Sequence, residues 1–536
     1  MMRVQAFPAK HALAVFTEQI SDVLRLVPEG IVLKDTVGDC VVAVPHHPNV
    51  VNLLTQSGVE DVPHPMTTFY PFPGRFKPFD AQRATADFAT MHDRCFILNS
   101  MGLGKTMTSL WAFDFLRSIK KVNKLLVVCP LSTMERTWGD EIFQSFPQYK
   151  VNVLHGTSAR RKKLLADTEA DIYIINTDGI SIIQEELANR DDIDLVIIDE
   201  VALFRNQSTT RWKVMNKICN KQTPRKVWGM TGSPTPNLPT DAWAQCKLVT
   251  PSNPDLPKYF SRFRDETMLK INMFKWLPKP NAPDLVFKIM QPSIRFSLDD
   301  CLDLPPQTVT SREVPMTKEQ DKAYKDMFNK LVFELKGQEV NAVNEAIKAG
   351  KLLQICSGVA YDNMGQEVVL PMKPRLECLK EIVEESEGKV IVFVPFTGAI
   401  HAVVDYLREN EVSTEIIDGS VGKNERDRIF GTFQNSPDIR VIVANPAAMS
   451  HGLTLTAATT IVWYGPTYSN EVYQQACARV RRPGQKRTTV IVHMVSSPLE
   501  RSIYQRLDKK QSLQGALLDL VADTSNENLR TLTEDV

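Results

Sequence analysis

The stretch 97-ILNSMGLGKTMTSL-110 combines the end of an apolar strand, a glycine-rich turn and the start of a helix. Backbone N–H groups of such a turn point inward and meet a helix N-terminus, which suits phosphate oxygens. Lys105 would reach the β- and γ-phosphates of a nucleotide, and Thr106 would ligate magnesium. The strict pattern has glycine where this chain has Asn99. A strand–turn–helix with an incidental Gly-Lys-Thr is therefore the alternative interpretation.

Apolar runs of the strand type alternate with helical patterns in two parts of the chain. In the first part these runs are 94–100, 124–130, 171–177, 193–200 and 226–232, and in the second part 389–395, 412–419, 439–445, 459–465 and 489–495. Near-continuous Val, Ile and Leu runs are typical of strands that helices cover on both faces, hence of parallel sheets. The sequence therefore predicts an α/β fold with two parallel sheets.

The alternation also suggests where the domains begin and end. We expect a small N-terminal accessory domain (1–75), a first lobe (76–250), a helical insertion or linker region rich in proline (251–372), a second lobe (373–510) and a C-terminal tail (511–536). The proline-rich exit of the first part contains 69-FYPFPGRFKPF-79, an aromatic and basic arm. Such an arm could stack on bases, but we favour packing against the first lobe.

Composition narrows the class of protein. A chain of 536 residues is too long for one core. Lys plus Arg equals Asp plus Glu at 63 each, so a nucleic-acid surface would have to be a local groove. The nine cysteines are scattered without a Cys-x-x-Cys pair, which argues against zinc and against a disulfide framework. With no signal peptide and no membrane-length apolar run, we expect a soluble, cytoplasmic protein of a bacterium or a virus-infected cell.

A second candidate site follows the predicted strand in 195-LVIIDEVALF-204. Ligand sites of α/β proteins lie at the carboxyl ends of strands. Asp199 can hold magnesium, and Glu200 can orient or deprotonate the attacking water. A solvated acidic turn is the alternative.

The third candidate is 474-QQACARVRRPGQK-486, in which Arg479 and Arg482 are three residues apart and would share a helix face. A γ-phosphate in transfer needs extra positive charge, which arginine supplies in planar, bidentate form. A basic solvated helix or a nucleic-acid contact would produce the same pattern.

With these motifs in order, the chain resembles the Snf-type (chromatin-remodeller-like) DNA translocases of helicase superfamily two, over about residues 76–510. The further matching segments are 77-KPFDAQRATADF-88, 128-VCPLSTMERTW-138, 174-IINTDGI-180, 203-LFRNQST-209, 229-GMTGSPTPNLPTDAW-243, 302-LDLPPQTV-309, 418-DGSVGKNERDRIFGTFQ-434 and 445-NPAAMSHGLTLTAATTIV-462. The resemblance implies two RecA-like lobes, with ATP and Mg²⁺ as cofactors.

The resemblance also implies individual roles. Gln82 would contact adenine, and Gln475 would join Arg479 and Arg482 as sensor and arginine fingers from the second lobe. The phosphates would be held by Gly102, Leu103, Gly104, Lys105 and Thr106, with Thr106 and Asp199 at the metal and Glu200 at the water. The backbone of a nucleic acid would be touched by Pro130, Ser132 and Thr177, contacts that position a strand without reading its sequence.

Several residues depart from the family pattern. Asn99 and Ser100 replace an acidic pair, and Ala202 replaces a histidine that usually couples the second and third motifs. That coupling is therefore in doubt, although hydrolysis is not. Ala478 replaces a glycine, and 445-NPAA-448 stands where a run led by Ser or Thr is common.

The function implied is an ATP-dependent translocase that hydrolyses ATP on duplex or branched DNA. It would remodel forks, anneal strands or displace bound proteins. The Pro-Phe-x-x-Gln sequence before Arg83 favours the fork-remodelling, annealing-helicase-like branch, and the compact length is compatible with a viral relative. We expect a monomer that binds DNA and no membrane, with other replication or recombination proteins as further partners. The alternatives are a strand-separating DNA or RNA helicase, a non-catalytic nucleic-acid-binding clamp, and the motor subunit of a nuclease or restriction system.

Overall fold

The chain divides into two units in the computed structural model. The structure describes residues 2–220, 225–271, 276–301, 303–336, 342–361, 367–449 and 454–509. The first unit comprises residues 1–235, 240–264 and 281–301, and the second 236–239, 265–280 and 302–536. The expected tail at 511–536 lies outside the described residues, as do residues 450–453 of the segment 445–462.

The main sheet of the first unit has seven parallel strands in the order β13-β5-β10-β9-β6-β8-β7. Their bounds are β5 (Arg94–Ile97), β6 (Lys124–Cys129), β7 (Val151–Val153), β8 (Ile172–Asn176), β9 (Ile193–Asp199), β10 (Lys226–Met230) and β13 (Ser293–Ile294). The five strands predicted in this part of the chain are present. The parallel sheet that their apolar runs indicated is therefore confirmed.

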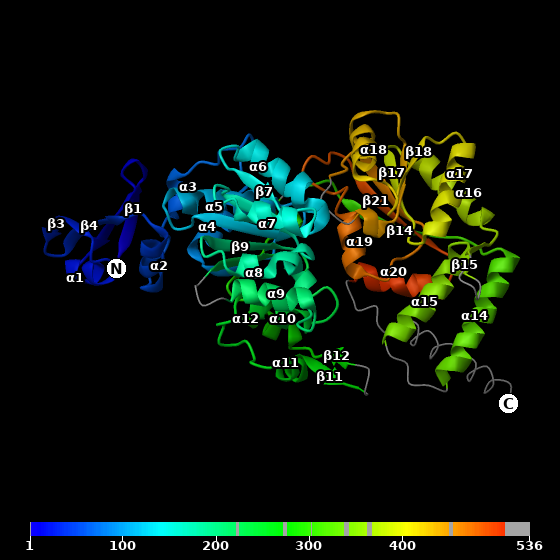
Figure 1. Ribbon diagram of the computed structural model, residues 1–536, viewed down its shortest axis with the longest axis horizontal. Coiled ribbons are helices and arrows are strands. Elements are labelled where there is room, and N and C mark those ends of the chain that lie inside the picture. Colours follow the sequence, from blue (N-terminus) through cyan, green and yellow to red (C-terminus); the bar gives the residue numbers. More distant parts are fainter. Residues whose placement is uncertain are drawn as a thin grey trace. The chain divides into compact units, whose positions relative to one another are not determined.

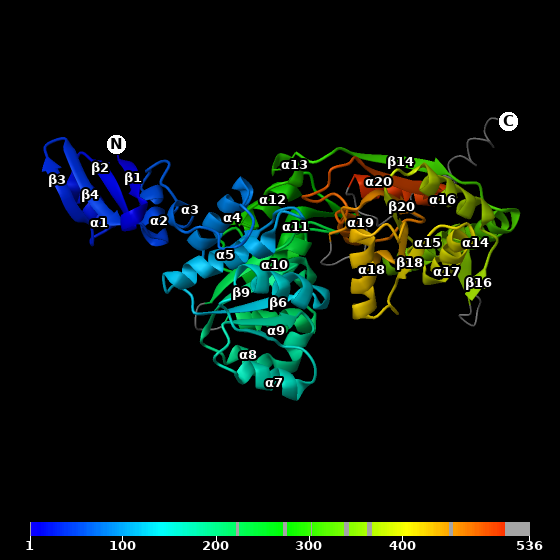
Figure 2. The same cartoon turned by 90° about the horizontal axis from the view of Figure 1, so that it is seen from above.

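Helices cover both faces of this sheet (Figures 1 and 2). One face packs against α4 (Asp80–Met91), α5 (Lys105–Ser118) and α6 (Asp140–Ser145), and the other against α7 (Ser158–Ala166), α8 (Gln184–Ala188), α9 (Thr210–Cys219), α10 (Asp241–Val249), α11 (Phe260–Thr267) and α12 (Ala282–Ile289). Side chains of β6 alternate between the two cores: Leu125 and Val127 face the first, Leu126 and Val128 the second. This alternation is the period-two geometry of a strand, and it explains why the run is apolar throughout.

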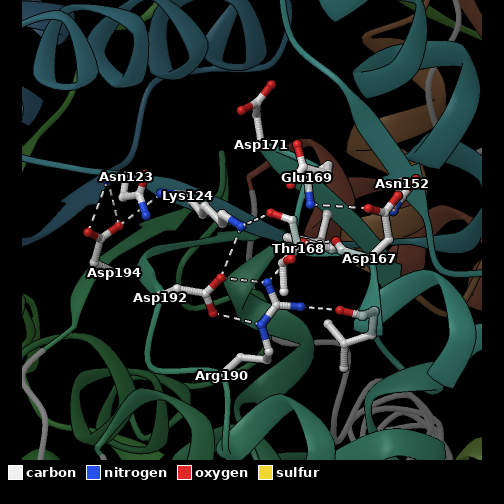
Figure 3. Close-up of polar contacts among 12 residues, drawn as sticks. Asn123, Lys124, Asn152, Asp167, Thr168, Glu169, Asp171, Arg190, Asp192 and Asp194 are labelled. Atoms are coloured by element: carbon white, nitrogen blue, oxygen red, sulfur yellow. Dashed lines mark hydrogen bonds and ion pairs between the residues drawn. The ribbon is translucent and has the colours of Figure 1, made fainter.

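A polar network closes the amino-terminal edge of the sheet (Figure 3). Asp192 accepts two hydrogen bonds from Arg190, each 2.7 Å, and lies 3.0 Å from the Lys124 ammonium. Asp194 accepts from the backbone N–H groups of Asn123 and Lys124. These ion pairs and hydrogen bonds satisfy the charged side chains at the amino-terminal edge. The candidate site residues lie at the opposite, carboxyl edge, where α/β sheets bind ligands.

The N-terminal part of the first unit has its own antiparallel sheet, in the order β1-β2-β4-β3. Its elements are β1 (Arg3–Phe7), β2 (Ala12–Thr17), α1 (Ile20–Leu26), β3 (Ile31–Thr36), β4 (Asp39–Pro45), α2 (Pro48–Gln56) and, after them, α3 (Pro65–Phe69). Leu13, Val15, Val42 and Val44 form a core with residues of both α1 and α2. This part therefore has a hydrophobic core separate from those of the large sheet.

The aromatic arm after this sheet packs against α5. Tyr70 donates a hydrogen bond of 2.7 Å to Asp114, and the ring of Phe72 meets Trp111 edge-on at 5.5 Å between centroids. The ring centroids of Phe69 and Phe115 lie 6.2 Å apart. The packing interpretation of the arm is confirmed for these three aromatic residues.

The second unit contains a sheet of six parallel strands in the order β14-β21-β20-β17-β19-β18. The strands are β14 (Gln307–Glu313), β17 (Lys389–Phe393), β18 (Thr414–Ile417), β19 (Val441–Ala444), β20 (Ala458–Trp463) and β21 (Thr489–Val495). One face packs against α16 (Lys373–Glu385) and α17 (Thr397–Glu409), and the other against α14 (Lys318–Lys336), α15 (Ala342–Cys356), α18 (Lys423–Asn435), α19 (Asn470–Cys477) and α20 (Pro498–Asp508). The second predicted parallel sheet is therefore also confirmed.

The region 251–372, expected to be a helical insertion, also contributes strands. β13 pairs with β5 in the first sheet, and β14 pairs with β21 in the second. The same region holds α13 (Leu298–Cys301) and two small hairpins, β11 (Met268–Lys270) with β12 (Trp276–Pro278) and β15 (Val359–Tyr361) with β16 (Glu367–Val369). β13 has two residues and follows Pro292, and proline is typical of an edge strand. A strand of two residues is also too short to give a periodic signal in the sequence.

Within the described part of the chain, a search for membrane-spanning helices finds none with the necessary length and hydrophobicity.

One buried ion pair connects α16 and α20 in the second unit. Arg375, in the first turn of α16, lies 2.8 Å from Glu500 in the first turn of α20, and both side chains are at most 2% exposed. Arg375 also donates to the backbone oxygens of Cys356 and Met494, which belong to other elements. A charge buried in this way is tolerated only while its partner is present.

We therefore predict that Arg375→Leu destabilises the second unit by about 3–5 kcal/mol, because Glu500 is left as an unpaired buried charge. Hydrogen–deuterium exchange of the amides of β20 and β21 in the full chain measures the change. Glu313→Gln is the control, since it removes an exposed ion pair with Arg501 and should cost less than about 1 kcal/mol. Equal protection in the two variants would contradict the prediction.

Candidate active site

The glycine-rich turn lies between β5 and α5. Gly102 and Gly104 have φ angles of +88° and +70°, in the left-handed region that glycine adopts without steric cost. A Cβ at Gly104 would also lie 2.5 Å from the side-chain nitrogen of Gln82. The turn delivers the chain directly into α5, which begins at Lys105 and has Thr106 as its second residue, while Leu103 is buried. This is the strand–turn–helix geometry that suits a phosphate group.

Lys105 reaches back over this turn. Its ammonium donates a hydrogen bond of 2.8 Å to the backbone oxygen of Asn99 and a longer one of 3.4 Å to that of Ser100. The positive charge therefore lies within the curve of the loop. Phosphate oxygens are stronger acceptors than these carbonyl groups, so the ammonium would donate its hydrogen bonds to the phosphates when a nucleotide is bound.

Asn99, a departure from the phosphate-loop pattern, has a structural role. Its side chain is 1% exposed, donates to the Thr85 hydroxyl at 2.8 Å and accepts from the backbone N–H of Phe296 at 3.0 Å. It thereby ties the start of the loop to α4 and to the segment that follows β13. A glycine could make neither contact, which accounts for asparagine at this position.

Gln82 is held beside the loop rather than pointing away from it. Its carbonyl oxygen accepts from the backbone N–H of Phe79 at 2.9 Å, and its amide donates to the Leu103 oxygen at 3.2 Å. A carboxamide has two donors and two acceptor positions, so one of each is left for an adenine ring. Contact of Gln82 with adenine stays a prediction, and the hydrogen bond to Leu103 shows that this side chain also supports the glycine-rich turn.

Asp199 and Glu200 end β9 at the same edge of the sheet. Asp199 is buried and accepts a hydrogen bond of 3.0 Å from the indole nitrogen of Trp138. Burial, and then the charge of Glu200, raise the pKa of Asp199 to about 6, while the Trp138 N–H and the Lys105 charge act in the opposite direction. A divalent cation would compensate the buried charge, so the residues present fit a magnesium ion.

The described residues offer no metal cage made by protein alone. Among them there is no cluster of three or more His, Cys, Asp or Glu side chains able to hold a metal. Magnesium typically binds through one or two protein ligands and completes its shell with water and phosphate oxygens. Thr106 and Asp199 remain the two predicted protein ligands, a number that such a shell would accommodate.

Glu200 makes a contact that the sequence put in doubt. Its backbone has a φ of +56°, and its carboxylate accepts a hydrogen bond of 3.0 Å from the hydroxyl of Thr231. Thr231 follows β10 directly and is 1% exposed. The second and third motifs are therefore coupled in this chain through Thr231, although Ala202 lacks the usual side chain. Sequence reasoning missed Thr231 and Trp138 as site residues, although both lie inside segments that match the family.

The three residues expected to touch a nucleic acid lie at the ends of two neighbouring strands. Pro130 follows β6 and Thr177 follows β8, and the N–H of Thr177 donates to the Cys129 oxygen at 3.1 Å. Pro130 and Thr177 are buried, whereas Ser132 is exposed. Of these three residues, Ser132 is thus the one whose side chain is directly accessible.

The remaining candidates belong to the second unit, and one expectation about them is wrong. α19 ends at Cys477, so Arg479 and Arg482 lie in the turns after the helix rather than on its face. Pro483 disfavours helical backbone at Arg482, and Gly484 has a φ of +98°, so the helix cannot continue. Gln475 and Arg479 are buried, and Arg482 donates to the Ala478 oxygen at 2.9 Å and to the Thr454 hydroxyl at 3.1 Å.

Comparisons with known proteins identify the family of the chain. A family model described as the SNF2-related domain matches residues 81–358, more than half of the chain, and one described as the helicase conserved C-terminal domain matches residues 374–484. The chain belongs to the SNF2-related family. It is therefore a nucleic-acid-dependent ATPase of the helicase type, as the resemblance implied.

Individual relatives are distant. The chain is 26% identical to putative protein p41 of Acyrthosiphon pisum secondary endosymbiont phage 1, over 78% of this chain and 93% of that protein. It is 25% identical to an uncharacterized ATP-dependent helicase of Mycoplasma pneumoniae and 23% identical to the human DNA annealing helicase and endonuclease ZRANB3, and spans 42% and 39% of their lengths. Among solved structures, the Sulfolobus solfataricus SWI2/SNF2 ATPase core in complex with dsDNA aligns with 21% identity and a TM-score of 0.40, over 82% of this chain and 92% of that one.

The contact between Glu200 and Thr231 can be tested directly. We expect Thr231→Val to lower the kcat of ATP hydrolysis by about 10- to 100-fold, because the carboxylate loses the hydroxyl that orients it, while ATP binding changes little. Thr231→Ser keeps the hydroxyl and serves as the control. Steady-state ATPase kinetics decide the matter, and an unchanged kcat in the valine variant would rule out this role for Thr231.

Proposed function

We propose that this protein is an ATP-driven translocase that moves along duplex or branched DNA. The observation that carries the proposal is the convergence of Lys105, Asp199, Glu200 and Thr231 at one edge of the first sheet, next to strands whose ends bear Pro130, Ser132 and Thr177. Hydrolysis and strand contact would thus share one rigid scaffold. The DNA-acting relative ZRANB3 supports DNA as the substrate.

The chemistry proposed for the first unit uses its own side chains. Bound Mg²⁺–ATP supplies the phosphoanhydride bond whose hydrolysis drives the motor. Lys105 and the backbone of residues 102–104 bind the phosphates, Gln82 contacts adenine, and Asp199 with Thr106 holds the metal. Glu200, oriented by Thr231, positions the attacking water and takes its proton.

The second unit is proposed to supply charge. Arg479 and Arg482 would stabilise the negative charge that develops on the γ-phosphate, and Gln475 would sense the nucleotide. Desolvation lowers the pKa of Arg482 to about 10, so this side chain is still positively charged at neutral pH. Contacts with the sugar-phosphate backbone of DNA would not depend on the base sequence, and a motor that moves along any DNA requires this.

The resulting activity would remodel forks, anneal strands or displace bound proteins. A strand-separating DNA or RNA helicase, a non-catalytic clamp and the motor subunit of a nuclease or restriction system are the competing functions. ATPase rates with duplex DNA, single-stranded DNA and RNA distinguish a translocase on duplex DNA from a strand-separating helicase and from a non-catalytic clamp. A forked-DNA assay then tests remodelling. Turnover no higher than that of a Lys105 variant would favour the clamp.

Two variants test the site itself. We predict that Lys105→Ala abolishes nucleotide turnover, because the phosphates lose their only lysine ligand in the proposed site. We expect Arg479→Ala to bind ATP almost normally and to hydrolyse it roughly 10³-fold more slowly, since the arginine acts on charge that develops in transfer. Both are measured as ATPase rates at saturating DNA.

Lys121→Ala and Arg487→Ala are matched controls, because both positions are exposed and lie outside the proposed site. They should retain the turnover of the unmodified protein. Full activity in Lys105→Ala or Arg479→Ala would refute the corresponding assignment.

A further inference from the structure

The buried indole of Trp138 donates its hydrogen bond to the proposed metal ligand. Trp138 is fully buried, and its Nε1 lies 3.0 Å from Oδ2 of Asp199. It belongs to a π-helical turn, Met134–Gly139, on the face of the sheet that α4, α5 and α6 cover. π-Helical turns are rare and recur at functional sites.

Two other buried tryptophans of the first unit, Trp228 and Trp243, use their indole groups differently. Trp228 donates to the backbone oxygen of His92 at 3.1 Å, and Trp243 to that of Pro257 at 2.9 Å. These bonds satisfy a buried N–H group, which is the usual requirement for tryptophan in a core. Trp138 instead donates to an ionisable side chain at the carboxyl end of β9, so its hydrogen bond acts on a site residue.

The hydrogen bond restricts the Asp199 carboxylate. The terminal torsion of an aspartate is soft, so an unsupported carboxylate samples a broad range of orientations. The indole ring cannot move with it, because the ring is packed in the same core as Leu125, Val127 and Ile142. One carboxylate oxygen is therefore fixed by a rigid donor, and a metal shell completed by few protein ligands depends on such fixing.

We propose that Trp138 is a positioning residue that orients Asp199 for the magnesium ion of the bound nucleotide. The inference rests on the proposed role of Asp199 as the metal ligand. It also gives the π-helical turn a function, because this turn continues directly from the 3₁₀ turn Leu131–Thr133 that contains Ser132. In the segment 131–139, Ser132 would then contact the nucleic acid and Trp138 would support the metal site.

The test measures nucleotide affinity by equilibrium fluorescence titration, with a fluorescent non-hydrolysable ATP analogue in the presence of Mg²⁺ and in EDTA. We expect Mg²⁺ to tighten binding in the unmodified protein. In Trp138→Phe this tightening should fall by about 10-fold, the usual effect of removing a group that orients a metal ligand, while affinity in EDTA stays the same. Trp228→Phe is the matched control, because it removes a buried indole hydrogen bond in the same core, away from Asp199.

A second replacement guards against misfolding of the phenylalanine variant. β-(3-Benzothienyl)alanine in place of Trp138 keeps the volume of the ring and replaces the N–H by sulfur, and it should show the same loss. Undiminished Mg²⁺-dependent tightening in this protein, an equal loss in Trp228→Phe, or no Mg²⁺ effect in the unmodified protein would each overturn the inference.

The proposed function fails by a different measurement. If duplex DNA did not stimulate the ATPase of the unmodified protein, translocation on DNA would be refuted, whereas the equilibrium titration would still report on Trp138. Conversely, normal DNA stimulation together with an unchanged titration in the Trp138 variants would refute this inference alone.

Discussion

The register of three parallel strands fixes how the glycine-rich turn, Glu200 and Thr231 of the first unit come together. β10 pairs with β9 so that Met230 lies opposite Asp199, and pairs with β5 so that Met230 also lies opposite Ile97. The residues that follow these three positions must therefore leave the sheet at one edge: the glycine-rich turn, Glu200 and Thr231. A shift of one residue in either pairing would turn each side chain of the strand to the opposite face and separate these groups.

That register places a carboxylate where it is costly to keep it charged. Burial raises the pKa of Asp199, and the adjacent Glu200 raises it further. The protein opposes this with the Trp138 N–H and with Lys105, whose ammonium also bonds to the Asn99 oxygen. An added cation would offset this buried charge, and the phosphates of a bound nucleotide would in turn accept hydrogen bonds from Lys105. Cation and phosphates would thus favour each other's binding.

Much of the fold could be predicted because each inner strand is covered on both faces. The Val- and Ile-rich runs of β6, β9 and β17 are long enough to distinguish buried parallel strands from amphipathic ones. β13 escaped prediction because two residues carry no period, and its pairing with β5 is a contact between positions about 200 residues apart in the chain. The spacing of Arg479 and Arg482 predicted a helix, but Pro483 and Gly484 decide the backbone there.

The site was only partly predictable, for a similar reason. Lys105, Asp199 and Glu200 sit in local patterns whose chemistry is visible in sequence. The hydrogen bonds that orient the two carboxylates come from Trp138 and Thr231, which are 61 and 31 residues away along the chain. Nothing in a local pattern shows which carboxylate a distant donor will meet, so these contacts require the folded sheet.

The N-terminal sheet illustrates how packing decides between two interpretations of one segment. Tyr70 and Phe72 of the aromatic arm could have stacked on bases, but the Tyr70 hydroxyl is bonded to Asp114 and the Phe72 ring is packed against Trp111. Phe76 of the same arm, in contrast, is 75% exposed. His11 comes just before β2, and its ring centroid lies 4.1 Å from that of Phe69, which in turn approaches Phe115 on α5. Rings committed to such contacts cannot also stack on a strand without giving up their buried area. The arm therefore joins the accessory sheet to α5, the helix whose first residue is Lys105.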